Sequence, residues 1–121
     1  MADEADDRIT PVPFRVAVSR TPEVARVTAV GDVDLATVDE FTAGLNSALS
    51  APGVRRVVID LAEVGFLASS GISALIGAHR RGQRQSTTVV LVNCRPTVAK
   101  VLEITGVDKV LTPDGDHAPE L

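Results

Sequence analysis

The chain has 121 residues, with 12 Lys and Arg against 16 Asp and Glu, and a formal net charge of −4. Its apolar share of 45% is enough to build one small core without metal or disulfide staples. The acidic balance and an aromatic share of only 2% exclude the basic, base-stacking surface of a nucleic-acid-binding protein.

The two ends of the chain differ in composition from its middle. Residues 1–10 contain four acids and one Arg, and residues 113–121 contain three acids, so residues 11–112 are close to neutral. We therefore predict one domain over residues 11–112 between two disordered tails. The chain shows no signal-peptide pattern and no apolar run near the roughly 20 residues of a membrane span. With Cys94 as its single cysteine, it is expected to be a cytoplasmic protein without a membrane segment.

The domain is predicted to open with a β-hairpin. Residues 14–18 and 24–30 alternate apolar with small or polar side chains, which is typical of half-buried strands. The intervening Thr21-Pro22 marks a short turn. Arg26 lies on one face of the second strand, and we expect that face to front solvent.

A helix is predicted after the turn Gly31-Asp32-Val33-Asp34. Its apolar positions recur close to every 3.6 residues, at Leu35, Val38, Phe41, Leu45 and Leu49. Either Asp34 caps its start, or Thr37 does so with Glu40 as a capping-box partner. These two alternatives differ by one turn, and Ala51-Pro52-Gly53 ends the helix in both.

The rest of the domain alternates strands and helices. Residues 54–61 predict a central strand buried on both faces, and residues 87–92 predict another buried strand. A helix is expected to begin near Ser69-Ser70-Gly71 and to end at Arg80-Arg81-Gly82, and a third to run from Pro96 to Gly106. Residues 107–112 predict a short last strand. The order β-β-α-β-α-β-α-β indicates an α/β fold with a mixed sheet and helices packed on it.

Catalytic signatures are missing from the sequence. It has no Gly-rich phosphate loop, and Ser69-Ser70-Gly71 lacks the leading Gly of a nucleophile elbow. His79 and His117 have no sequence neighbour that suggests a triad or metal site, and turn and cap roles explain Asp32 and Asp34 better than metal binding. We therefore expect no enzyme, no metal and no cofactor.

Two further features have a structural and a functional interpretation. Cys94 is interpreted as a small buried apolar residue, with a redox-sensing thiol as the alternative. Arg80, Arg81 and Arg84 are interpreted as a solvated helix end, with a docking point for an acidic partner as the alternative.

Ser69 and Ser70 are the most informative pair, because they lie where a helix is predicted to begin. Serine is a preferred N-cap, and capping is the simpler interpretation. A helix N-terminus also tolerates an added phosphate, because its free N–H groups carry partial positive charge. A phosphoserine there would add about −1.5 to −2 charge at pH 7. The two interpretations are compatible.

Over residues 13–112 the chain resembles a STAS domain of the anti-sigma-factor antagonist type. The resemblance rests on three motifs in order: Gly31-Asp32-Val33-Asp34, then Val57-Val58-Ile59-Asp60-Leu61 followed by Val64 and Phe66-Leu67, then Ser69-Ser70-Gly71-Ile72. The order of elements agrees with that family as well. At one position the chain departs from the pattern, because Ala68 stands where the family usually has Asp.

The resemblance implies a binding protein that is the substrate of a kinase. Family members bind an anti-sigma factor that is also a serine kinase of ATPase-type fold, which frees the sigma factor. Phosphorylation of the serine directly before the Gly, here Ser70, ends the contact, and a serine phosphatase restores it. The implied partner-binding residues are Asp34, Ser69, Ser70 and Gly71.

Two other functions remain open on the sequence. One is a phosphorylation-independent scaffold or sensor subunit that forms homodimers or mixed assemblies, which Ala68 favours. The other is a small-molecule or nucleotide binder that uses the helix start at Ser69-Ser70-Gly71 as an anion site.

Overall fold

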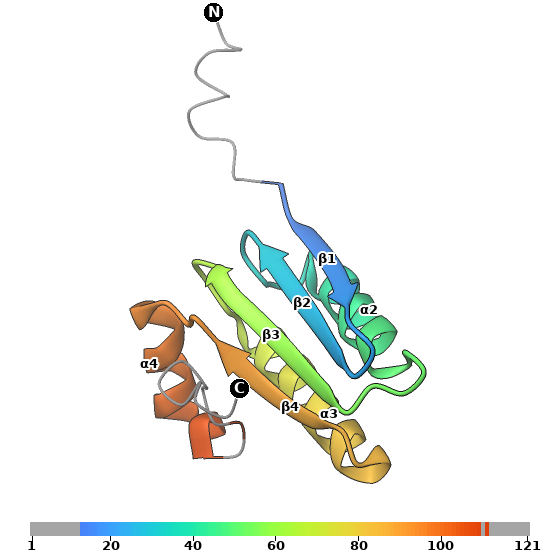
Figure 1. The fold of residues 1–121 in the computed structure, drawn as a ribbon. Helices are drawn as coiled ribbons and strands as arrows, with labels where there is room; N and C mark the ends of the chain where they lie inside the picture. The colour runs from blue at the N-terminus through green and yellow to red at the C-terminus, as the bar shows by residue number, and fades with distance from the viewer. Residues whose placement is uncertain (1–12, 110, 112–121) are drawn as a thin grey trace, which may run out of the picture.

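The computed structural model describes residues 13–109 and Leu111. It contains four strands, three helices and a short 3-10 helix (Figure 1): β1 (Arg15–Arg20), β2 (Val24–Val30), α2 (Val38–Leu49), β3 (Arg56–Glu63), α3 (Ser69–Gln85), β4 (Thr88–Val92), α4 (Pro96–Thr105) and η1 (Val107–Lys109). The predicted tails, residues 1–10 and 113–121, lie outside the described residues.

The strands form one mixed sheet in the order β1-β2-β3-β4. β1 and β2 are antiparallel, which confirms the predicted hairpin, and β2, β3 and β4 are parallel to one another. The parallel pairs need crossover connections, which α2 and α3 supply behind the sheet as seen in Figure 1. The predicted α/β class with a mixed sheet is confirmed.

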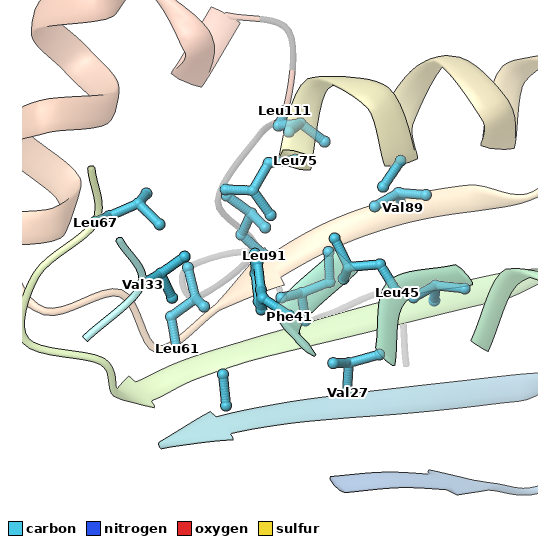
Figure 2. Packing of buried hydrophobic residues seen from close by; sticks show 14 of the residues in the cluster. Val27, Val33, Phe41, Leu45, Leu61, Leu67, Leu75, Val89, Leu91 and Leu111 are labelled. Atoms are coloured by element: carbon cyan, nitrogen blue, oxygen red, sulfur yellow. The ribbon is translucent and has the colours of Figure 1, made fainter. Parts of the chain in front are cut away.

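The core lies between the sheet and these helices. It consists of Val, Leu, Ile and Ala side chains together with Phe41 (Figure 2). Ala25, Val27 and Ala29 of β2 are fully buried, whereas Arg26 on the other face is exposed, as predicted. In the central strand β3, Val57, Val58 and Ile59 are all buried as predicted, although Asp60 on the face of Val58 is only partly buried.

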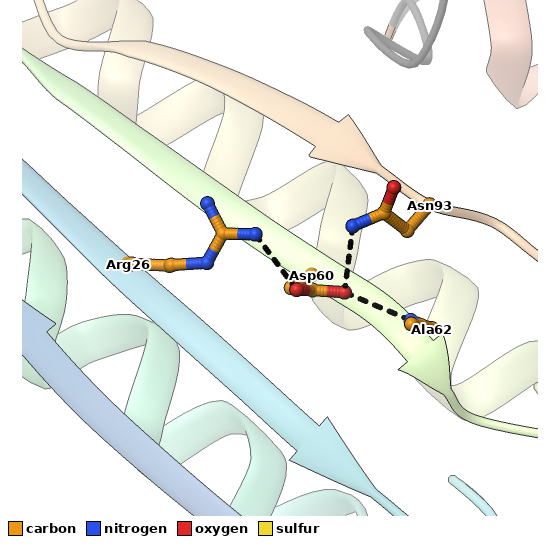
Figure 3. A network of polar contacts seen from close by, with 4 residues as sticks. All are labelled: Arg26, Asp60, Ala62 and Asn93. Atoms are coloured by element: carbon orange, nitrogen blue, oxygen red, sulfur yellow. Dashed lines mark hydrogen bonds and ion pairs between the residues drawn. The ribbon is translucent and has the colours of Figure 1, made fainter.

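On the face of the sheet opposite α2 and α3, Asp60 links β2 and β3 to Asn93, which directly follows β4 (Figure 3). Arg26 Nη2 donates to Asp60 Oδ2 at 2.7 Å, and the Ala62 N–H and the Asn93 amide donate to Asp60 Oδ1 at 2.9 and 3.3 Å. Burial raises the pKa of Asp60, but the Ala62, Arg26 and Asn93 contacts outweigh it and keep the pKa below the ordinary value. Folding therefore favours the ionised form of the Asp60 carboxylate.

Asp60 is expected to make the fold sensitive to acid. Because its folded-state pKa is lowered, its contribution is present above the unfolded-state pKa of about 3.9 and is lost as pH falls through the folded-state pKa. The melting temperatures of the wild type and Asp60→Asn should differ at neutral pH and converge below about pH 4. Thermal unfolding followed by circular dichroism across this range measures it, and a constant gap between the two curves would contradict it.

The structure decides between the two predicted starts of α2 in favour of Thr37, and one predicted helix end is wrong. Helix α2 begins at Val38 with Thr37 as N-cap, so Leu35 lies before the helix and does not join its buried face. Helix α3 runs past Gly82 to Gln85, and the left-handed Ser86 follows it. A Cβ on Gly82 would come within 2.5 Å of the Thr87 carbonyl oxygen. The glycine therefore lets the helix pass close to the chain entering β4 and does not mark its end.

The predicted last strand is also wrong. Val107–Lys109 is a 3-10 helix, and the Leu111 N–H donates to the Val107 carbonyl at 2.7 Å. Gly106, with φ of 80°, ends α4 as predicted and turns the chain so that Val107 and Leu111 are buried. The apolar residues Val107 and Leu111 are buried by local turns and not by a strand. No helix within the described ranges is long and apolar enough to span a membrane.

Candidate functional site

Two loops at the carboxyl ends of β2 and β3 are joined by backbone hydrogen bonds. The Val33 N–H donates to the Phe66 carbonyl at 2.9 Å, and the Ala68 N–H donates to the Val33 carbonyl at 2.8 Å, which makes a parallel bridge between Val33 and Leu67. Figure 2 shows both side chains at the same end of the core. The turn with Asp34 is thereby held beside the start of α3.

Gly71 is required for this arrangement. A Cβ there would lie 2.6 Å from Val33 Cγ1 and 2.7 Å from Leu67 Cδ1. Both neighbours are buried, and their backbones are held by the bridge between the loops. Gly71 therefore sets how closely the first turn of α3 approaches the Asp34 loop.

Asp34 shapes its own turn. Its Oδ1 accepts hydrogen bonds from the Ala36 and Thr37 N–H groups at 3.0 and 3.2 Å. The Thr37 hydroxyl accepts from the Asp34 N–H at 3.0 Å and donates to the Asp32 carbonyl at 2.8 Å. These bonds account for Asp34 as a turn-forming residue, and the bridge between Val33 and Leu67 holds that turn beside α3. Among the described residues no group of three His, Cys, Asp or Glu could hold a metal ion.

The predicted serine cap is wrong, although the predicted helix start is right. Helix α3 begins at Ser69 with Ala68 as N-cap, and among the described residues no side chain caps it. Ser69 is exposed at the first helical position. Ser70 at the second is half-buried, and its Oγ is buried with no hydrogen-bond partner in the part of the chain that the structure describes.

A side-chain cap is expected to stabilise this helix. In an Ala68→Asp variant the carboxylate can accept from the N–H groups of the first turn and lies at the positive end of the helix dipole. We expect a gain of about 1 kcal/mol in the free energy of unfolding, measured by denaturant titration. Ala68→Leu, which cannot accept a hydrogen bond, is the control. An unchanged midpoint for Ala68→Asp would contradict the prediction.

Each of the two loops also exposes one large apolar side chain. Leu35 is 82% exposed and Phe66 is 51% exposed. Leu35 was expected in the core, and Phe66 was expected only as part of a motif, so neither was predicted as a surface residue. The Thr37 cap is the signal for Leu35, because a helix that starts after Thr37 leaves Leu35 outside it. Exposed apolar residues beside polar ones are typical of protein contact surfaces.

The remaining candidates do not gather at this site. Burial, and then the charge of Asp60, raise the pKa of the half-buried Cys94 thiol to about 11, so the reactive thiolate is scarce at neutral pH. His79 is half-buried on α3, while Arg80 and Arg84 are exposed near its end. His117 lies outside the described residues.

The comparisons with known proteins point to one family. The family model for the STAS domain matches residues 15–118. The anti-sigma F factor antagonist of Lysinibacillus sphaericus is 26% identical over 86 residues, which cover 71% of this chain and 74% of that protein.

Two solved structures have the same fold. The unphosphorylated anti-sigma factor antagonist SpoIIAA superposes with a TM-score of 0.69 at 23% identity, over 84% of this chain and 87% of that one. An anti-sigma factor antagonist from Mycobacterium paratuberculosis superposes with a TM-score of 0.75 at 24% identity, over 84% and 85%.

Proposed function

The chain belongs to the STAS domain family, and from this premise we propose that it is an anti-sigma-factor antagonist. In this proposal it binds an anti-sigma factor that is also a serine kinase, and the sigma factor is released for transcription. Phosphorylation of Ser70 ends the contact, and a serine phosphatase restores it. The chain is then a regulatory binding protein and the substrate of a kinase, not an enzyme.

The observation that carries the proposal is the position of Ser70. It lies in the first turn of α3, beside the loop bridge that holds Asp34 next to the helix. Ser69, Leu35 and Phe66 are exposed on the same two loops and helix start. The surface thus combines a hydroxyl acceptor with apolar contact area, and relatives of the chain carry the antagonist name.

The phosphate-transfer step follows ordinary kinase chemistry. Ser70 Oγ attacks the γ-phosphorus of ATP held by the kinase, its proton passes to a base on the kinase, and ADP leaves as the bond to the γ-phosphorus breaks. Because Ser70 Oγ is buried in the free protein, its side chain must rotate outward before transfer. Hydrolysis of the phosphoester by the phosphatase returns the hydroxyl.

A capture experiment tests the proposal. Wild type and Ser70→Ala, immobilised as baits in a lysate of the source organism, should both retain an anti-sigma factor of ATPase-type fold, identified by mass spectrometry. With ATP and that purified kinase, wild type and Ser69→Ala should gain one phosphate and Ser70→Ala none. Baits that retain no anti-sigma factor, or a Ser70→Ala that is still phosphorylated, would overturn it.

A second function is favoured by one observation. Ala68 caps α3 without a side-chain bond, and the family's usual Asp is missing from the surface where a kinase would act. This favours a phosphorylation-independent scaffold or sensor subunit that forms homodimers or mixed assemblies. Such a protein should give the same molar mass by light scattering for wild type, Ser70→Ala and Ser70→Asp, with a value above the monomer.

A further inference from the structure

A shallow groove runs between α2 and α3, and it begins at Ser70. Thr42 and Asn46 line it from α2, and Ser70, Ala74, Gly77 and Arg84 line it from α3. Its α3 side is thus made of small side chains up to the last turn, where arginine replaces them. The side chains that line the α3 side of the α2–α3 groove are therefore mostly small. Because Ser70 lines its near end, the groove is continuous with the phosphorylation surface proposed above.

No contact or backbone conformation within the described residues requires a glycine at position 77. Gly77 lies in the middle of α3, it is exposed, and a Cβ built on it meets nothing within 4 Å. Glycine is the least favourable helix residue after proline, so alanine should be preferred here on helix propensity alone. Gly71 and Gly82 of the same helix each have a close neighbour that excludes a Cβ. The open space above Gly77 is suited to the close approach of another helix.

Positive charge is concentrated at one end of the groove. At its far end Arg81 is held by hydrogen bonds to Asn46 and Ser50, at 3.3 and 2.7 Å. Arg84 lies beyond it, exposed, and no described residue forms an ion pair or hydrogen bond with its guanidinium. At the near end the lining residues Val38, Thr42 and Ser70 carry no charge. The charged lining residues, Arg81 and Arg84, therefore lie at the far end, and Arg84 is the one that is free to attract a negatively charged partner there.

We propose that the α2–α3 groove docks an acidic helix of the anti-sigma factor. This inference rests on the proposed function. It adds a second contact region to the one at Ser70, and it adds the direction in which the partner helix runs. Small side chains of the docked helix lie against Gly77, and a carboxylate lies opposite Arg84. Helices that meet at a glycine approach closely, and the basic end fixes the direction in which the partner helix runs. Binding then involves both Ser70 and a region about four helical turns away, at ~1.5 Å per residue along α3.

Four variants test the groove against the captured anti-sigma factor, produced as a pure protein and titrated calorimetrically. Gly77→Gln fills the space above α3, and we expect at least a tenfold loss of affinity. Arg84→Glu should weaken binding about tenfold and reduce its salt dependence. Ala43→Gln and Lys100→Glu make matched changes in volume and charge at exposed positions outside the groove, and should bind as the wild type does.

Gly77→Ala separates binding from folding. It should raise the melting temperature by about 4 to 8 °C while it weakens binding, because alanine favours the helix but occupies the contact. If Gly77→Gln and Arg84→Glu bind like the wild type, the groove proposal is overturned and the proposed function stands. If the wild-type bait retains no anti-sigma factor, both are overturned together.

Discussion

Ser70→Asp is expected to lose about 5- to 150-fold in affinity for the anti-sigma factor, relative to the wild type. The substitution places a permanent negative charge at the second residue of α3, on the surface formed by the two bridged loops. A charge desolvated at a contact costs about 1 to 3 kcal/mol when nothing compensates it, and each 1.4 kcal/mol is a factor of ten. Isothermal titration with the purified partner measures the change.

The fold itself should tolerate the same substitution. A carboxylate in the first turn of a helix meets the positive end of the helix dipole, and the first turn of α3 has no acidic residue of its own. With the carboxylate rotated outward, as the Ser70 hydroxyl must be for phosphate transfer, we therefore expect the melting temperature of Ser70→Asp to equal or exceed that of the wild type. A loss of binding at unchanged stability assigns the effect to the contact and not to unfolding.

Ser70→Asn is the matched control, because asparagine has nearly the size of aspartate and no charge. It should retain most of the wild-type affinity. If Ser70→Asn loses as much affinity as Ser70→Asp, then the size of the side chain and not its charge disturbs the contact. If Ser70→Asp binds like the wild type, the switch assigned to Ser70 is wrong.

Local chemistry made several elements of the fold predictable from the sequence. Pro96 and Gly106 bound α4 as expected, because a proline fits the first turn of a helix and a glycine with φ of 80° suits its end. The hairpin and its exposed Arg26 face also follow from period-two alternation. In each case the deciding interactions lie within a few residues of each other.

Tertiary contacts decided the features that the sequence could not predict. Gly82 has the local pattern of a helix end, but the passing chain at Thr87 is what requires it. Residues 107–112 have the apolar content of a strand, but η1 forms there instead. The start of α3 at Ser69 was predictable, whereas the capping role of Ala68 and the buried Oγ of Ser70 depend on how the loop approaches the helix.

Gly82→Ala is expected to be the most destabilising of the substitutions considered for α3. Its Cβ would lie 2.5 Å from the Thr87 carbonyl oxygen and 2.9 Å from Val89 Cγ2. The carbonyl belongs to the backbone that enters β4, and Thr87 is buried and donates its N–H to the Gly82 carbonyl at 2.8 Å. Neither partner can move without breaking this hydrogen bond, so α3 must shift away from the sheet.

We expect Gly82→Ala to cost about 2 kcal/mol after the gain in helix propensity, and to lower the melting temperature by roughly 10 °C. Gly77→Ala introduces the same methyl group into the same helix where a Cβ meets nothing, and should stabilise the protein by about 1 kcal/mol. Thermal unfolding of the two variants therefore separates packing from propensity by the sign of the shift. Equal shifts for both would show that α3 does not pass as closely to Thr87 as the structure places it.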